Sequence, residues 1–271
     1  MAARREGTSG TRFQYTRASM SDRDPSRREF LETSLLAIPT LTRSDAGQPQ
    51  GSGRAALHIV CVGAHPDDPE SGCGGTLARY AAAGHRVTII YLTRGERGIP
   101  GRALDEAARI RTAEAEQACR ILGATPLFAG QIDGATEVNA REIDRMVSLV
   151  RPAQPDTVFT HWPIDSHPDH QAASLLAIRA WYALKQSFPL YFFEVNAGSQ
   201  TIAFRPTTHV DVTATRDAKK RALAAHQSQR GDEIYRMHHE PMEMFRGREI
   251  GTTAAEAFVR LDRSGELPVV R

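Results

Sequence analysis

The chain has 271 residues, of which 41% are hydrophobic and 24% are charged, and its formal net charge at pH 7 is +2. This is the composition of an ordinary globular domain, and so small a charge gives no case for nucleic acid or an anionic membrane surface as a partner. Three cysteines are too few for a disulfide framework and lack the spacing of a zinc ribbon. We interpret Cys61 and Cys73 as small packed hydrophobes rather than as reactive or bridging thiols.

The first 47 residues differ in composition from the rest and contain one short apolar segment, within 29–41. The pair Arg27-Arg28 precedes that segment, which is the pattern of a twin-arginine export signal, and Met20 would give it a more typical start. We expect 1–47 to be a leader that directs export to the periplasm or the cell exterior. A disordered basic tail on a cytoplasmic protein is the alternative. No stretch approaches the roughly 18 apolar residues of a membrane span.

Beyond the leader, apolar runs alternate with helical patterns, which is typical of a doubly wound α/β fold with a mostly parallel sheet. Strands are predicted over 58–64, 86–93, 125–129, 156–161, 189–195 and 209–212. Helices are predicted over 74–83, 103–122, 139–150, 169–185 and 215–227, the last capped by Thr215. The segment 230–251 is charged and reads as irregular, and 253–261 is a closing element of uncertain type. We expect one domain over 55–271, in which either of the last two strands can run antiparallel.

Polar side chains that can bind a metal follow the first predicted strand directly. His65, Asp67 and Asp68 stand within four residues, and Pro66 favours a turn there. An imidazole and two carboxylates make half of a metal site, at the sheet edge where open α/β folds bind their ligands. The glycines at 72–75 do not meet the dinucleotide-binding pattern, so we interpret them as room for a helix to pack beside this loop.

A second cluster, His161 to His170, follows the fourth predicted strand. If Pro168 takes the first helical position, His167 caps the helix and His170 lies one turn in. Because strand–helix junctions of a parallel sheet share one edge, the two clusters can converge. Two histidines and one carboxylate would leave coordination positions open for water and substrate, as in a catalytic site. Without thiolates, the metal is Zn²⁺ or Fe²⁺, and the sequence does not separate these two ions.

Two more polar residues remain for catalysis beside such a metal. Asp67 is free to accept a proton from water whose pKa the metal has lowered. His167 can act from the other side as an imidazolium that stabilises an oxyanion and protonates a leaving amine. Asp169 or Asp165 could orient and charge it through a hydrogen bond.

The paired motifs Ala64-His65-Pro66-Asp67-Asp68 and His167-Pro168-Asp169-His170 resemble those of the PIG-L/LmbE family of metal-dependent N-acetylglucosamine de-N-acetylases. The similarity extends from about residue 57 to 261. It implies a Rossmann-like hydrolase that uses zinc, with His65, Asp68 and His170 as metal ligands. It also implies Asp67 as the general base and His167 as the electrophile or acid.

The resemblance assigns further residues less directly. Arg111 matches a family arginine that reaches the sugar, and Asp133 matches an acidic residue that holds sugar hydroxyls; a helix-surface arginine and a turn aspartate are the alternatives. The segments 93–96 and 226–229 also look similar, without an assigned role. One departure is that Pro69 follows the aspartate pair where the family usually has glutamate, and Glu70 comes next.

The sequence therefore predicts a metallohydrolase that removes an acetyl group from an N-acetylglucosamine-type sugar or glycoconjugate. An export signal fits an envelope glycan, a glycolipid or a scavenged amino sugar better than an intracellular thiol precursor. A metallohydrolase acting on another amide or an ester, and a carbohydrate-binding relative that has lost turnover, remain as alternatives. The sequence is silent on the oligomeric state.

Overall fold

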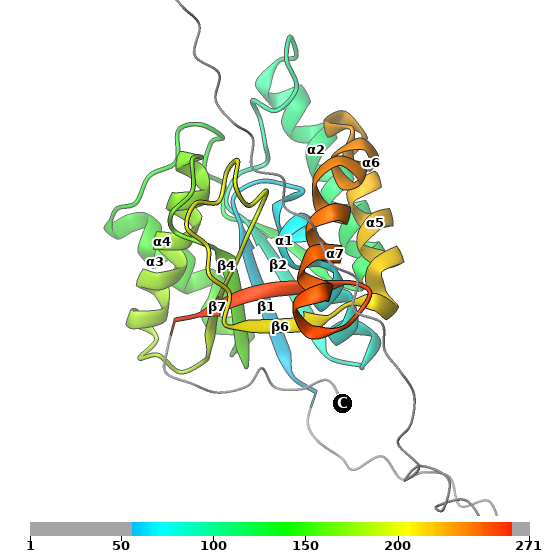
Figure 1. The fold of residues 1–271 in the computed structure, drawn as a ribbon. Helices are drawn as coiled ribbons and strands as arrows, with labels where there is room; N and C mark the ends of the chain where they lie inside the picture. Colours follow the sequence, from blue (N-terminus) through cyan, green and yellow to red (C-terminus); the bar gives the residue numbers. More distant parts are fainter. Residues whose placement is uncertain (1–55, 262–271) are drawn as a thin grey trace, which may run out of the picture. The chain divides into compact units, whose positions relative to one another are not determined.

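The computed structural model describes residues 56–261, and seven strands within them form one sheet (Figure 1). The strands are β1 (His58–Gly63), β2 (Arg86–Tyr91), β3 (Thr125–Phe128), β4 (Thr157–His161), β5 (Leu190–Phe193), β6 (Thr208–Asp211) and β7 (Ala255–Arg260). The helices are α1 (Asp68–Ala82), α2 (Leu104–Leu122), α3 (Ala140–Val150), α4 (Pro168–Ala183), α5 (Arg216–Ala224), α6 (Gly231–Ile234) and α7 (Glu240–Ile250). Within the described residues, no helix is both long and apolar enough to cross a membrane.

The strand order is β3-β2-β1-β4-β5-β7-β6. Strands β1 to β5 pair in parallel, whereas β7 pairs antiparallel with both β5 and β6. The predicted doubly wound, mostly parallel fold in a single domain is confirmed for this part of the chain. Of the two strands that could have reversed, β5 continues the parallel sheet, and the reversed strand is the closing element β7.

Helices cover both faces of the sheet, so the strands are buried on both sides (Figure 1). Alternate residues of β1 point into two separate apolar clusters: Ile59 and Cys61 face the side of α1, α2 and α5, and Val60 and Val62 face the side of α3 and α4. A strand buried on both faces has a continuous apolar run instead of alternation, which is why the run could be recognised. Cys61 lies in this packing as a buried free thiol, its Sγ 3.4 Å from that of Cys73.

The direction of winding reverses between β1 and β4. From β1 the chain proceeds outward to β2 and β3, and it then returns to place β4 on the other side of β1. The carboxyl ends of β1 and β4 therefore border the crevice that such a reversal leaves in an open α/β sheet. The loops after these two strands carry both histidine-containing motifs.

Two predictions about the C-terminal half were wrong. Within the segment 230–251, residues 231–250 are helical, with a π-helical turn (Tyr235–His239) between α6 and α7. Such a turn changes the side-chain period, so the apolar positions do not follow one helical stripe. The hydroxyl of Thr215 does not cap α5 but donates to the carbonyl oxygen of Gly75, 2.8 Å away. The predicted leader 1–47 lies outside the described residues.

Candidate metal centre and substrate pocket

The two motifs lie at the start of two helices. His65 and Asp67 follow β1, and Asp68 is the first residue of α1. As predicted, His167 caps α4 and Pro168 takes its first position, which places His170 in the first turn. Both motifs thus meet at the carboxyl edge of the two central strands.

The side chains of His65, Asp68 and His170 converge on one point. Nδ1 of His65 lies 3.1 Å from Oδ2 of Asp68, and Nε2 of His170 lies 3.3 Å from Oδ1. One ligand atom from each of the three lies within 4.8 Å of the others, and all three residues are buried. Donor atoms placed at about 2.0–2.2 Å around a tetrahedral zinc ion would stand about 3.4 Å apart, so these spacings fit a shared cation.

The second nitrogen of each histidine faces another carboxylate. Nε2 of His65 lies 3.1 Å from Oδ2 of Asp169, and Nδ1 of His170 lies 3.1 Å from Oδ1 of Asp165. Histidines that bind a metal characteristically present the other ring nitrogen to a carboxylate, which fixes the ring and its tautomer. The sequence had suggested that Asp169 or Asp165 orients His167. In the structure these carboxylates contact the rings of His65 and His170, and Asp165 reaches His167 only through the backbone N–H of His167, at 2.9 Å.

The charges of this cluster favour a cation at its centre. Burial opposes ionisation of Asp68, but the facing imidazoles of His170 and His161 hold the pKa of Asp68 well below its usual range. Burial also opposes a charge on His170, yet Asp68 and Asp165 raise the pKa of His170 to about 9. The donor set of two imidazoles and a carboxylate without a thiolate suits Zn²⁺ or Fe²⁺.

His161 lies beside the candidate metal ligands, and the sequence analysis did not assign it a role. Its ring stacks on that of His170 with centroids 4.2 Å apart, and its Nε2 accepts the backbone N–H of Ala64 at 3.1 Å. Burial, followed by repulsion from His170, lowers the pKa of His161 to about 4. A neutral ring at this position fixes the backbone just before His65.

Asp67 has an unusual backbone conformation, with a φ of 105° that non-glycine residues rarely adopt. Its carboxylate lies 3.2 Å from Nη2 of Arg111, which also donates to the carbonyl oxygen of Pro66. Burial raises the pKa of Asp67, against the opposing effect of Arg111. Arg111 itself is buried between Gly95 and Gly98, where any larger residue would meet its guanidinium. It therefore fixes the turn that aims Asp67.

His167 approaches the centre from the other side. Its Nδ1 accepts the backbone N–H of Asp169 at 3.2 Å, so Nε2 is the nitrogen that can donate to a ligand. Its ring centroid lies 4.8 Å from that of His65 and 4.7 Å from that of His170. Burial and the neighbouring rings of His65 and His170 lower the pKa of His167.

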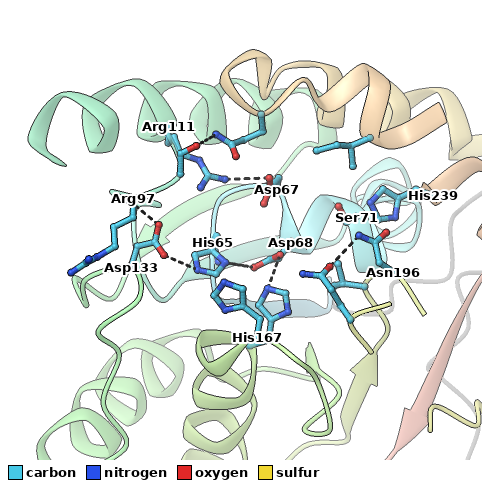
Figure 2. A pocket seen from close by; sticks show the side chains of 16 residues that line it. His65, Asp67, Asp68, Ser71, Arg97, Arg111, Asp133, His167, Asn196 and His239 are labelled. Atoms are coloured by element: carbon cyan, nitrogen blue, oxygen red, sulfur yellow. Dashed lines mark hydrogen bonds and ion pairs between the residues drawn. The ribbon is translucent and has the colours of Figure 1, made fainter. Parts of the chain in front are cut away.

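These side chains line a pocket of about 460 Å³ (Figure 2). Asp133 lies at its wall with Oδ1 3.3 Å from Nε2 of His65, while its Oδ2 accepts the backbone N–H of Arg97 at 2.9 Å. The pocket also has lining residues that the sequence analysis did not single out as site residues: Ser71, Arg97, Gly98, Val195, Asn196, Gln200, Gln229, Ile234 and His239. Of these, only Gln229 belongs to the two further segments, 93–96 and 226–229, that the sequence analysis noted without assigning a role.

Pro69, which stands where the family usually has glutamate, is accommodated by its neighbours in the structure. The ring of Pro69 packs where any side chain at position 63 would stand, so Gly63 is required beneath it. Glu70 is fully buried and accepts the hydroxyl hydrogen of Tyr91 at 2.6 Å, and it lies 3.2 Å from Nε2 of His226. The segment 226–229 thus reaches the metal loop through Glu70.

Comparison with known proteins agrees with this geometry. The model of the PIG-L family, described as GlcNAc-PI de-N-acetylase, matches residues 60–181, which contain both motifs. This chain belongs to the PIG-L family. A relative in Actinosynnema mirum, a 1D-myo-inositol 2-acetamido-2-deoxy-α-D-glucopyranoside deacetylase, is 28% identical over 65% of this chain and 81% of its own length.

Two solved structures of proteins with different activities share this fold. The N,N′-diacetylchitobiose deacetylase of Pyrococcus horikoshii is 25% identical, with a TM-score of 0.68 over 76% of this chain and 84% of its own. The 4-carboxy-2-hydroxymuconate hydratase of Pseudomonas putida KT2440 is 24% identical, with a TM-score of 0.69 over 79% of this chain and 100% of its own. Since a hydratase shares the fold, the fold alone does not determine the reaction.

Proposed function

We propose that this PIG-L protein is a metal-dependent hydrolase that removes the acetyl group from an N-acetylglucosamine-type sugar or glycoconjugate. The observation that carries the proposal is the convergence of His65, Asp68 and His170, with Asp67 and His167 on either side, at the floor of one pocket. The relatives that deacetylate N-acetylglucosamine derivatives support the same reaction.

His65, Asp68 and His170 would hold the metal, and we favour Zn²⁺, with Fe²⁺ or another divalent ion as the alternative. Its chemical contribution when bound would be Lewis acidity, which polarises an amide carbonyl and makes water more acidic. Asp169 and Asp165, through their contacts with the outward nitrogens of His65 and His170, would keep these rings in the required tautomers.

Asp67 and His167 would carry out the proton and charge chemistry. Asp67, held by Arg111, takes a proton from the attacking water as the C–O bond forms. His167 donates its Nε2 hydrogen to the carbonyl oxygen, on which negative charge develops. The C–N bond then breaks, and the proton that Asp67 accepted balances the one that the departing nitrogen requires. The products are acetate and a free amino sugar.

Arg111 and Asp133 keep a place in the proposal, in a changed form. Both line the pocket, but their charged groups contact Asp67 and His65 respectively. We therefore propose that they position those two residues, and that any contact with sugar hydroxyls is secondary.

The test is acetate release from a panel of N-acetyl sugars by the full chain, stripped of metal and reloaded separately with Zn²⁺, Fe²⁺, Co²⁺ or Mn²⁺. Asp67→Asn should retain the metal and lose most acetate release, whereas His170→Ala should lose the metal itself. Hydrolysis of other amides or esters without any sugar deacetylation would support the metallohydrolase alternative. Sugar binding without turnover by any metal form would support the non-catalytic alternative.

We further propose that the protein is exported, on the basis of Arg27-Arg28 and the apolar segment that follows. Fractionation of the native host, with N-terminal sequencing of the recovered protein, tests this. A processed chain outside the cytoplasm is the expected result, and an unprocessed cytoplasmic chain would refute export without affecting the enzymatic proposal.

A further inference from the structure

A second cavity, of about 420 Å³, shares Asn196 with the pocket that holds the candidate metal ligands. We call that first pocket the metal pocket. The lining of the second cavity comes from the loop after β5 and from the π-helical turn and α7, and it includes Ala197, Met237, Pro241, Met242 and Phe245. We call this cavity the apolar groove. Its volume lies in the range of about 300–1,000 Å³ that small-molecule sites occupy.

The groove leaves large apolar side chains in contact with solvent. Met237 is 60% exposed and Phe245 is 54% exposed. Arg246 also lines the groove, but its guanidinium donates to both carboxylate oxygens of Glu194, at 2.7 and 2.8 Å, and lies 5.4 Å from the ring of Phe245. The charge is thus already neutralised by a buried partner. What the groove offers to a ligand is apolar surface, with flexible methionines that can adapt to it.

The groove and the metal pocket are neighbouring cavities that share a lining residue. Asn196 lines both, and neighbouring residues of the same segments divide between them: His238 lines the groove and His239 the metal pocket. Figure 2 shows Asn196 and His239 together at one end of the metal pocket, with Arg97 and Asp133 at the opposite end. A substrate whose acetamide reaches His65 and Asp68 would therefore have the groove on one side.

We propose that the apolar groove binds an alkyl or aryl aglycone attached to the amino sugar, so that the substrate is an N-acetylglucosaminide with an apolar aglycone. The inference rests on the proposed deacetylase function. A small-molecule occupant is favoured over a protein partner because the groove is a cavity of ligand size that borders the pocket of the candidate catalytic residues at Asn196. The sugar would occupy the polar pocket, and the aglycone would cover Met237 and Phe245.

The test compares N-acetylglucosaminides of one anomer with methyl, butyl and octyl aglycones, each below the concentration at which it forms micelles. One fully buried methylene corresponds to about fourfold in affinity, so even partial burial predicts at least about tenfold higher kcat/KM for octyl than for methyl. In Phe245→Ala and Met237→Gln the octyl advantage should fall at least fivefold, with the methyl compound changed less than twofold. The matched control is Leu175→Ala on α4, where the side chain is 44% exposed but lies on another helix.

A binding measurement separates this inference from the proposed function. Calorimetry with the octyl and methyl glycosides of the free amino sugar reports on the groove without turnover. Tighter binding of the octyl compound, weakened by Phe245→Ala, would support the groove even if no acetate is released, in which case only the proposed function fails. Acetate release with equal kcat/KM and equal binding for all chain lengths would overturn the groove proposal. A change in oligomeric state in Phe245→Ala, without a change in selectivity, would also overturn it, because the groove would then be a contact between copies.

Discussion

The stability of the domain should depend strongly on Glu256, a residue of β7 that is far in sequence from the candidate metal ligands. Its Oε1 accepts the backbone N–H of Gly75 at 2.9 Å, and its Oε2 accepts that of Thr76 at 2.7 Å. These donors lie just after Cys73, where α1 leaves helical geometry. Glu256 thus caps the second part of α1, and the Nζ of Lys219 lies 2.8 Å from its Oε1.

The magnitude follows from the burial of these groups. The side chains of Lys219 and Glu256 are 1% and 2% exposed. Removing one partner of such a pair typically costs about 3–5 kcal/mol, because the other charge is left buried. Lys219 retains Glu243 at 3.7 Å, which places Glu256→Gln near the lower end, at about 3 kcal/mol. For a domain of this size that corresponds to a Tm lower by roughly 6–12 °C.

Urea unfolding of the full chain measures this, with Glu106→Gln as the matched control. Glu106 pairs with Arg102 at 2.9 Å, but both side chains are exposed, so its loss should change the unfolding free energy by less than about 1 kcal/mol. The double variant with Lys219→Met should be more stable than the sum of the single effects predicts, by about 1–3 kcal/mol. A Glu256→Gln protein within 1 kcal/mol of the parent would refute the argument that this buried pair supports α1.

Three further predictions concern the same domain. Burial opposes the charge on Lys219, but Glu256 and Glu243 raise the pKa of Lys219 above the ordinary value of about 10.4. The unfolding free energy should therefore fall as the pH rises above that value, and it should fall less steeply in Lys219→Met. Unfolding curves between pH 9 and 11.5 measure both. Gly72→Ala should destabilise the protein by about 1–3 kcal/mol, because its Cβ would stand 2.1 Å from a ring atom of Phe193, and Gly74→Ala, with 3.3 Å to Lys219, should cost less. Adding Zn²⁺ at about 100 times its Kd to stripped protein should raise the unfolding free energy by about 2.7 kcal/mol, and His170→Ala should abolish this increase in a thermal melt.

The sequence was informative about the central sheet for a physical reason. A strand such as β1 is buried on both faces, so its run of apolar residues stands out, and the polar residues that follow mark the strand end. Because strand ends in a parallel sheet share one edge, the meeting of His65 with His170 could be anticipated. Placing His167 at the cap of α4 required only the known preference of proline for the first helical position.

The sequence was less informative where long-range contacts decide the structure. We expected the first helix to begin at residue 74, but α1 begins at Asp68 and changes direction at Cys73, where Glu256 supplies the missing cap. That partner lies 181 residues away and has no local signal. Similarly, nothing in the sequence tells which ring nitrogen Asp165 or Asp169 will face. The helical segment 231–250 was missed because its π-helical turn interrupts the apolar period.

The candidate catalytic residues and the proposed aglycone groove lie in different parts of the chain. The family model covers residues 60–181, and this region contains every candidate ligand and catalytic side chain, from His65 to His170. The wall that includes Asn196, His239 and the apolar groove comes from later residues, in the loop after β5 and the C-terminal helices. Under the proposed function, a catalytic floor at the ends of β1 and β4 would act on different acetylated sugars when only this later wall changes. Substitutions at Asn196 or Phe245 should alter which glycoside is preferred, whereas substitutions at Asp67 should reduce turnover of all of them.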